Sequence, residues 1–319
     1  MTLAAQKVKL KTIFKEHWEG FWKDYREEFP KDMHKTIEEA VEKMIGCGDI
    51  ANGYFHYKCV SCGHGDTKVG FSCKSRFCPR CGKIYTDEWV EKTAESVADV
   101  EHRHLVFTIP EEFRGVFYWT RKLLKQLADL AKETIEAELE RQQKRNGSKE
   151  KLIAGILIVI HTFGRDLKWN PHIHVLIADR AIEKKSGRVI KFPFLLYRTF
   201  HKVWQYKFLN FLKKQFPKNR ELQERINKCW REHPDGFYVN VQKPMKDAKQ
   251  TIFYIGRYLG RAAIAEYRIV NYDGQEVTFW YEDHETGKRE YLTLPVYRFM
   301  ARLVQHIPPK NFPMVRRYG

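Results

Sequence analysis

Apolar residues recur at helical spacing through the first half of the chain. The pattern predicts amphipathic helices over residues 7–28, 32–45, 84–100 and 114–145. Glycines directly follow the second range, and a turn-type run at 145–148 ends the last one. The first helix carries four aromatic residues at this spacing, which we interpret as core positions: Phe14, Trp18, Phe21 and Trp22.

Short apolar runs predict β-strands. They cover residues 104–109, 153–161 and 172–178, and the last two are close enough in sequence to pair as a hairpin. The remaining expected elements are a helix over 194–216, a strand over 238–241, a helix over 247–267, a hairpin within 277–299 and a helix over 296–306. The chain therefore combines helices with short strands.

The chain carries a large basic surplus. Its 319 residues include 57 Lys+Arg against 40 Asp+Glu, a formal net charge of +17, and 14% of them are aromatic. Lys and Arg suit a polyanion because each neutralised phosphate releases a counterion, and aromatic rings stack on bases. The composition favours a nucleic-acid partner over a surplus that serves only solubility.

No apolar run reaches the roughly 20 residues that a membrane-spanning helix needs. The longest run, residues 152–160, has the length of a strand, and the N-terminus lacks an apolar segment followed by a small-residue cleavage site. We therefore expect no membrane partner and a cytoplasmic location, where cysteines stay reduced.

Five of the seven cysteines lie between residues 59 and 81. Cys59-x-x-Cys62 and Cys78-x-x-Cys81 are separated by 15 residues, a spacing typical of a zinc ribbon whose two knuckles complete one tetrahedral site. Four thiolates leave no coordination position for water, so this Zn²⁺ is expected to be structural. Further ligand candidates are Cys73, His64 and His56.

Basic residues surround the second Cys-x-x-Cys pair: Lys74, Arg76, Arg80 and Lys83. We interpret them as contacts to DNA phosphates, with a solvated surface as the alternative. Charge reversal at Lys74 and Arg76 is expected to weaken DNA binding without abolishing metal binding.

The segment Asn170-Pro-His-Ile-His174 places two histidines two residues apart. On a strand this spacing puts His172 and His174 on one face and turns Ile173 to the other. Two imidazoles on one strand can bind a single divalent cation, whereas two structural histidines are the alternative. A usable site needs a third ligand, and His161 at the end of the preceding strand is the first candidate. The reserve candidates are Gln250 and His104.

Tyr254 and Tyr258 lie four residues apart and share one face of the predicted helix, beside a second such pair, Arg257 and Arg261. A phenol has a pKa of about 10 and is a weak nucleophile unaided. A metal that polarises a phosphate, with arginines that offset negative charge, would make attack on phosphorus feasible. The alternative is a pair of packing tyrosines in a chain that contains 16.

Together these motifs resemble the rolling-circle transposases of the insertion sequence 91 family, two-tyrosine members of the HUH nuclease superfamily (histidine, hydrophobic residue, histidine). The resemblance covers nearly the whole chain and follows the family's order of motifs. It rests on residues 46–54 and 71–82 around the cysteines, then 104–110, 161–174, 254–261 and 306–319.

The resemblance implies an α+β fold with an antiparallel HUH nuclease core, similar to a ferredoxin or RNA-recognition fold, preceded by a helical and zinc-ribbon domain. It implies the following regions: 1–53 as N-terminal helices, 54–95 as the zinc-binding domain, 96–267 as the HUH catalytic domain, and 268–319 as a C-terminal hairpin and helix that complete the catalytic domain.

The resemblance also implies the chemistry. Mg²⁺ or Mn²⁺ would be held at His172 and His174, and Tyr254 and Tyr258 would act as successive nucleophiles on transposon ends and target DNA. Each cut would leave a 5′-phosphotyrosine and a free 3′-hydroxyl that rejoins strands without external energy. The implied partner is single-stranded DNA, which would also keep the protein at the nucleoid.

The motifs are also compatible with two other functions. A rolling-circle replication initiator or relaxase would use the same chemistry but recircularise its DNA, and the cysteine region and C-terminal motif favour the transposase. The chain has no Gly-x4-Gly-Lys-Ser/Thr phosphate-binding loop, so unwinding would need a host helicase or replication machinery. A non-enzymatic zinc-ribbon DNA-binding regulator is disfavoured by the intact histidine and tyrosine pairs.

Overall fold

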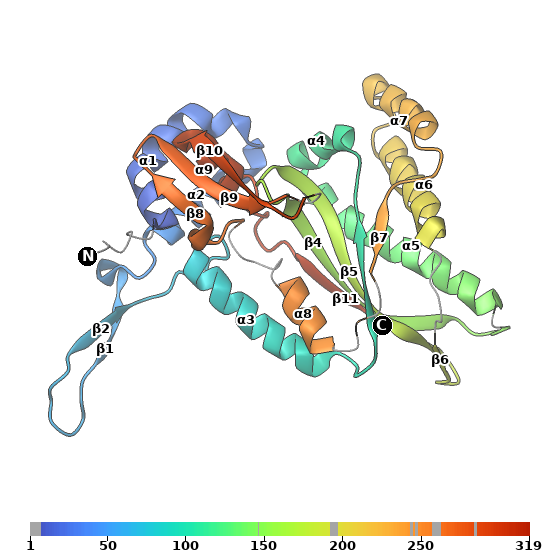
Figure 1. Cartoon of the computed structure of the whole chain (residues 1–319), viewed down its shortest axis with the longest axis horizontal. Coiled ribbons are helices and arrows are strands. Elements are labelled where there is room, and N and C mark those ends of the chain that lie inside the picture. The colour runs from blue at the N-terminus through green and yellow to red at the C-terminus, as the bar shows by residue number, and fades with distance from the viewer. Residues whose placement is uncertain are drawn as a thin grey trace. The chain divides into compact units, whose positions relative to one another are not determined.

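The computed structural model describes residues 8–145, 147–191, 197–242, 245, 248–256, 263–283 and 286–319. They form two compact units, each built from segments that lie far apart in sequence, whose elements are labelled in Figure 1. Unit 1 comprises the described residues of Met1–Trp89, Phe163–Trp169 and Gly260–Lys310, and unit 2 those of Val90–Thr162, Asn170–Leu259 and Asn311–Gly319. Helices combine with antiparallel strands in both, which confirms the expected α+β class. Among the described helices, none combines the length and apolar composition of a membrane-spanning segment.

Within the described residues, unit 2 is organised around a six-stranded sheet of order β11-β4-β5-β3-β7, with β6 paired to β5. Its strands are β3 (His102–Phe107), β4 (Leu152–Phe163), β5 (Trp169–Glu183), β6 (Val189–Lys191), β7 (Val239–Val241) and β11 (Val315–Tyr318). Its helices are α4 (Glu111–Trp119), α5 (Leu124–Arg145), α6 (Tyr197–Gln215), α7 (Arg220–Glu232) and α8 (Ala248–Gly256). Helix α3 (Pro79–Ser96) contributes residues to both units.

The two faces of this sheet differ because side chains alternate along each strand. Leu105 and Phe107 of β3 stand opposite Val175 and Ile173 of β5, and all four side chains are fully buried. Rings of α6 cover this face, with Trp204 lying 5.2 Å from Phe107 between ring centroids. The histidines of β3 and β5 have the opposite strand parity and so occupy the other face, where His161 of β4 meets His172.

Unit 1 joins N-terminal helices to a three-stranded antiparallel sheet of order β10-β9-β8. Its elements are α1 (Leu10–Tyr25), α2 (His34–Ile45), β8 (Ile269–Tyr272), β9 (Glu276–Glu282), β10 (Arg289–Pro295) and α9 (Val296–Val304). Helix α1 packs against α2 and α9. Phe14 and Phe21 are fully buried, as expected, while Trp18 and Trp22 are half-buried and stack with ring centroids 5.1 Å apart.

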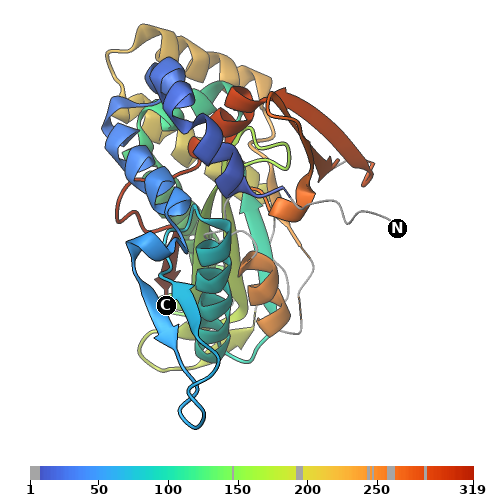
Figure 2. The same cartoon turned by 90° about the vertical axis from the view of Figure 1, so that its left-hand side faces the viewer.

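A separate hairpin extends from the helices of unit 1 as a narrow arm (Figure 2). In it, β1 (Tyr54–Tyr57) pairs antiparallel with β2 (Thr67–Gly70). Every residue of β1 is exposed, and Val60 in the connecting loop is fully exposed. An isolated two-stranded hairpin has little intrinsic stability, so the attachment at its base decides where it lies.

The helices differ from the expected ones at four places. The helix expected over 247–267 is not helical at residues 263–265. The helix expected over 114–145 is interrupted at Thr120, whose backbone leaves the helical region (φ −127°, ψ 71°), so α4 and α5 are separate. The helix expected from residue 84 begins at Pro79, because a residue without an amide hydrogen fits the first helical position. Helix α7 has no counterpart among the expected elements; Asn219 caps it by accepting a hydrogen bond from the Leu222 amide at 3.0 Å.

Candidate functional site

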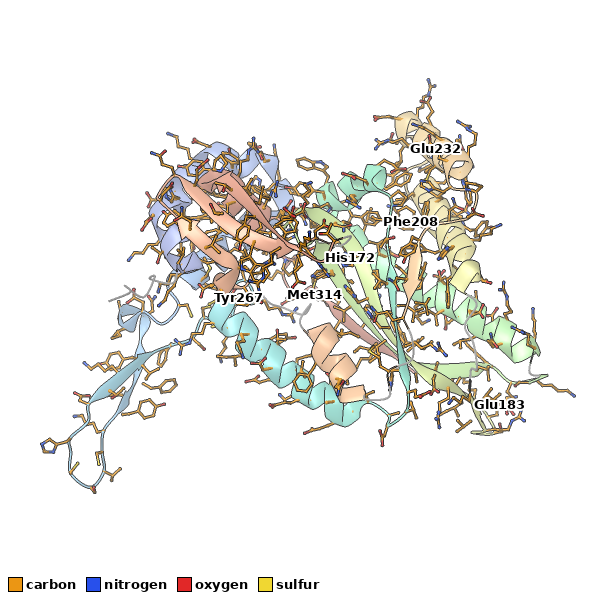
Figure 3. All side chains as sticks on the ribbon, in the orientation of Figure 1. His172, Glu183, Phe208, Glu232, Tyr267 and Met314 are labelled. Carbon is orange, nitrogen blue, oxygen red and sulfur yellow. The ribbon has the colours of Figure 1, made fainter. Side chains whose placement is uncertain are left out.

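Three histidines of unit 2 converge where two neighbouring strands meet. His161 lies near the end of β4, and His172 and His174 lie near the start of β5, where Figure 3 labels His172. The Nδ1 atom of His161 is 3.0 Å from Nε2 of His172, which is 3.1 Å from Nε2 of His174. One ring nitrogen of each histidine lies within 4.8 Å of the others. The structure thus brings the first candidate for a third ligand to the histidine pair.

Hydrogen bonding and burial leave ring nitrogens suited to a cation. Nδ1 of His172 donates to the carbonyl oxygen of Asn170 at 2.7 Å, so its Nε2 carries the lone pair that faces the other two rings. Burial holds the pKa of His174 well below its ordinary value, and repulsion from His172 and His104 acts in the same direction. His174 is therefore neutral near pH 7, the form in which an imidazole binds a metal.

A fourth histidine, His104 of β3, stands behind His174. It is fully buried, and its Nε2 lies 2.9 Å from Nδ1 of His174, with the two rings stacked. Burial lowers the pKa of His104, and this effect outweighs a hydrogen bond that the His104 ring donates to the Gln242 side chain, which raises it. A partner at one ring nitrogen fixes the orientation and tautomer of a metal-binding histidine. Of the two reserve ligands, His104 thus has the position of an orienting group, whereas Gln250 is exposed on α8.

The sheet face that carries the histidines continues into a hollow of about 550 Å³. Leu176 and Ala178 of β5 line it, with the same strand parity as the histidines, together with Gly155 of β4. Arg317 and Tyr318 of β11 close one side. Apolar walls with a few polar groups suit a flat, partly apolar ligand.

The predicted nucleophiles belong to the segment of α8. This helix packs against β3, and its Ile252 and Ile255 are fully buried. Tyr254 lies in α8 by its backbone, one residue before Ile255. Outside the described residues lie the Tyr254 side chain, Arg257, Tyr258 and Arg261. The tyrosine pair is therefore placed only by the helix that carries its first member.

Four cysteines of unit 1 form a second cluster. Their Sγ atoms all lie within 4.8 Å of one another: Cys47, Cys73, Cys78 and Cys81. Cys78 directly precedes α3, and Cys81 lies in its first turn. The base of the hairpin joins the first two, because the Gly48 amide donates to the Phe71 carbonyl at 3.0 Å. Four sulfur donors in one cluster fit a tetrahedral zinc ion.

The thiols of this cluster have pKa values shifted in opposite directions. A hydrogen bond from Cys73 lowers the pKa of Cys78 to about 5, with help from the backbone amides of Cys81 and Arg80 at the helix start. The same hydrogen bond, together with burial, raises the pKa of Cys73, and burial raises that of Cys47. A thiolate among close thiols is a ready receptor for a cation that displaces their protons.

This set differs from the ligand set expected from sequence. Cys59 and Cys62 lie in the exposed loop between β1 and β2, outside the cluster. The 15-residue spacing gives a separation along the chain and not a distance in space. The hairpin places Cys59 and Cys62 at its tip, whereas Cys47 and Cys73, which flank its two strands, meet at its base. The backbone amide of Cys62 and the Ser61 hydroxyl lower the pKa of Cys59 to about 6. Cys47 is absent from the ligand set expected from sequence, and its local signal is its position between two glycines before the hairpin.

The basic residues around the second Cys-x-x-Cys pair have different environments. Arg76 is half-buried: its Nη2 donates to Tyr85 Oη at 2.7 Å, and its guanidinium lies 4.4 Å from that ring's centroid. Lys83 pairs with an aspartate one helical turn further on. Lys74 and Arg80 are both exposed.

Two family models match the chain, and each contains one of the clusters. Residues 13–109 match "Transposase zinc-binding domain", and residues 155–319 match "Putative transposase". The chain belongs to the insertion sequence 91 family of transposases. The first match includes the four-cysteine cluster and the second the three histidines and α8.

This transposase has relatives over most of its length. It is 30% identical over 294 residues to "Transposase for insertion sequence element IS801" of Pseudomonas savastanoi pv. phaseolicola. The aligned region covers 88% of the chain and 69% of that protein. It is 26% identical over 309 residues to "Putative transposase y4qJ" of Sinorhizobium fredii, which covers 90% and 76%. No solved structure matches the chain.

Family membership has two direct consequences. A transposase cleaves and joins DNA, so DNA is a partner of this protein. The match to a zinc-binding domain, together with the four-cysteine cluster, supports Zn²⁺ as a cofactor.

Proposed function

We propose that this transposase cuts and rejoins single-stranded DNA by the rolling-circle route, through a covalent 5′-phosphotyrosine intermediate. The observation that carries the proposal is the convergence of His161, His172 and His174 from two neighbouring strands. Three imidazoles leave coordination positions for phosphate oxygens, which a four-thiolate site does not. The sheet of unit 2 would then be the antiparallel core of an HUH nuclease.

The histidine cluster is proposed to hold Mg²⁺ or Mn²⁺. Bound there, the ion would polarise the scissile phosphate and offset charge on its oxygens. The chain orients the ligands: the Asn170 carbonyl fixes the His172 ring, and His104 fixes the His174 ring. The hollow further along the same sheet face, lined by Leu176 and Ala178, would seat bases of the bound strand.

Tyr254 and Tyr258 are the proposed nucleophiles, one for the transposon end and one for the target. The phenol oxygen attacks phosphorus, the bond from phosphorus to the 3′ oxygen breaks, and that oxygen leaves as a hydroxyl with a proton. The phosphotyrosine bond keeps the phosphodiester energy, so the 3′-hydroxyl of another strand can attack it and release the tyrosine. Arg257 and Arg261 are proposed to offset charge in the transition state.

The four-cysteine cluster is proposed to hold a structural Zn²⁺ that fixes the hairpin base to α2 and α3. The donor set fits this role because four thiolates leave no open position for substrate. Lys74 and Arg80, exposed next to the cluster, are proposed to contact DNA phosphates. Arg76 and Lys83 would contribute less, since each already has a partner within α3.

Covalent capture of DNA tests the proposal. The protein is incubated with single-stranded DNA from the ends of its element and Mn²⁺, and the products are separated on a denaturing gel. Because tyrosine keeps the 5′ phosphate, a 3′ label should move into a protein-sized band, while a 5′ label should appear in a shorter free strand. The adduct should require the metal ion and vanish in the Tyr254→Phe/Tyr258→Phe variant. Tyr206→Phe, at an exposed tyrosine of α6, is the matched control.

The outcomes separate the functions weighed from the sequence. Binding without any adduct would show that the catalytic proposal is wrong and would leave a DNA-binding regulator. An adduct that recircularises its strand but never joins a second strand would indicate a replication initiator or relaxase. An adduct that joins a target strand supports the transposition route, in which a host helicase or replication machinery would unwind the DNA.

A further inference from the structure

One face of the three-stranded sheet in unit 1 is packed and the other is open. Val277 and Phe279 of β9 are fully buried on the packed face. Phe279 meets Phe299 of α9 with ring centroids 5.7 Å apart. Residues of opposite parity along β9 and β10 therefore point away from this core.

The open face carries a row of aromatic rings. Tyr291 of β10 stands directly opposite Trp280 of β9, and the ring of Tyr267, just before β8, lies 5.9 Å from Trp280 between centroids. Tyr291 is 63% exposed and Tyr267 is 70% exposed, while Trp280 is half-buried between them. Rings so exposed contribute little to the core, so their presence calls for another explanation.

Arginines are placed among these rings. The guanidinium of Arg289 lies 4.2 Å from the Trp280 ring centroid, and that of Arg268 lies 5.8 Å from it. Two glutamates share this face by strand parity, Glu276 and Glu282. Glu282 pairs with a third arginine, Arg165, whose Nη1 lies 3.7 Å from a carboxylate oxygen and donates to the Glu282 carbonyl. The aromatic row thus lies in a locally basic environment.

We propose that this open face binds single-stranded DNA, with bases stacked on Tyr267, Trp280 and Tyr291 and a phosphate at Arg289. Bases that are free of a duplex stack on aromatic side chains that project from a sheet, and arginine planes add to the stacking. The chain's net charge of +17 and the local arginines favour a polyanion over an apolar protein partner. The choice of single-stranded DNA as the partner rests on the proposed function. The arrangement of exposed rings and arginines is observed independently of it.

The test is the affinity for a fluorescently labelled oligo-thymidine, measured by anisotropy without divalent metal so that no cleavage contributes. Trp280→Ala and Tyr291→Ala should each raise the Kd by about tenfold. Arg289→Gln should reduce the slope of log Kd against log salt concentration by about one, the change expected for the loss of one phosphate contact. Matched controls are Trp119→Ala and Tyr206→Ala, at rings that are 58% and 63% exposed in unit 2, and both should leave the Kd unchanged.

Trp280→Phe keeps an aromatic ring and should retain most of the affinity, which separates loss of stacking from loss of folding. If Trp280→Ala/Tyr291→Ala binds oligo-thymidine as tightly as the unaltered protein, the proposal is overturned and the face is left for a protein partner. The double variant should still form the covalent adduct at saturating DNA. Failure of the unaltered protein to form any adduct would count against the proposed function alone, because the affinity measurement does not depend on cleavage.

Discussion

Nδ1 of His161 and Nε2 of His172 lie 3.0 Å apart, although the two residues are 11 positions apart in sequence. Their strands, β4 and β5, are neighbours in the sheet, and His161 is only 3% exposed. Two imidazoles at this separation cannot both be protonated without strong repulsion. With His174, the pair forms a set of three ring nitrogens able to take up a cation.

Replacing His161 by alanine should remove one of three metal ligands. We expect the affinity for Mn²⁺ to fall by more than about a hundredfold, since loss of a merely orienting partner already costs about 10- to 100-fold. Calorimetric titration of Mn²⁺ and the yield of covalent adduct measure the effect. His64→Ala, at an exposed histidine of the hairpin loop, is the control. Unchanged Mn²⁺ binding in His161→Ala would show that the third ligand is another group.

His104 should act as a positioning residue for His174. His104→Phe keeps a ring of similar shape but removes the group 2.9 Å from Nδ1 of His174. We expect Mn²⁺ affinity to fall by about 10- to 100-fold, with partial recovery in His104→Gln, which can again hydrogen bond. A purely structural role predicts a different result: a lower unfolding midpoint in both variants, with normal Mn²⁺ affinity in the folded protein.

Zinc retention distinguishes the two cysteine sets. Cys47→Ser/Cys73→Ser should lose the zinc bound with Cys78 and Cys81, because two of four clustered thiolates are removed. Cys59→Ser/Cys62→Ser should keep this zinc, since both residues lie in the exposed hairpin loop. Zinc per chain is measured by elemental mass spectrometry after gel filtration. The reverse result would restore the ligand set that the sequence spacing predicts.

Glu183 should make the stability of unit 2 depend on pH. Arg188 first, then the hydroxyls of Ser148 and Ser186, lower the pKa of this carboxyl to about 2 from its ordinary 4.5. A depressed folded-state pKa stabilises the fold above pH 4.5, and this contribution is lost as the pH falls toward about 2. Glu183→Gln should therefore lower the urea midpoint at pH 7 and differ progressively less from the unaltered protein between pH 4 and pH 2.

Glu91→Gln, at an exposed glutamate of α3, serves as the control for this pH series and should change the midpoint little at any pH. A difference between Glu183→Gln and the unaltered protein that stays constant from pH 7 to pH 2 would contradict the prediction. Such a result would mean that the substitution acts through packing rather than through ionisation.

The pattern of apolar residues predicts the elements that bury one face of a helix or one face of a sheet. The apolar spacing of residues 7–28 predicts α1, and the alternation in 277–299 predicts the β9–β10 hairpin. These predictions succeed because one helix face or one sheet face must be buried, and burial repeats at 3.6 or 2 residues. The apolar spacing of residues 114–145 gives no sign of the break at Thr120, so it predicts one long helix where the structure has two.

By itself, the sequence determined the family, the metal-binding residue types and the period-2 spacing that sets His172 and His174 on one face. Only the tertiary structure decided which distant groups meet them: His161 from the neighbouring strand, and His104 behind His174. It also decided that Cys47 and Cys73 join Cys78 and Cys81. The reason is physical: spacing along a chain fixes contacts only within one element, whereas strand order and a hairpin's closed base set which separate segments come within bonding distance.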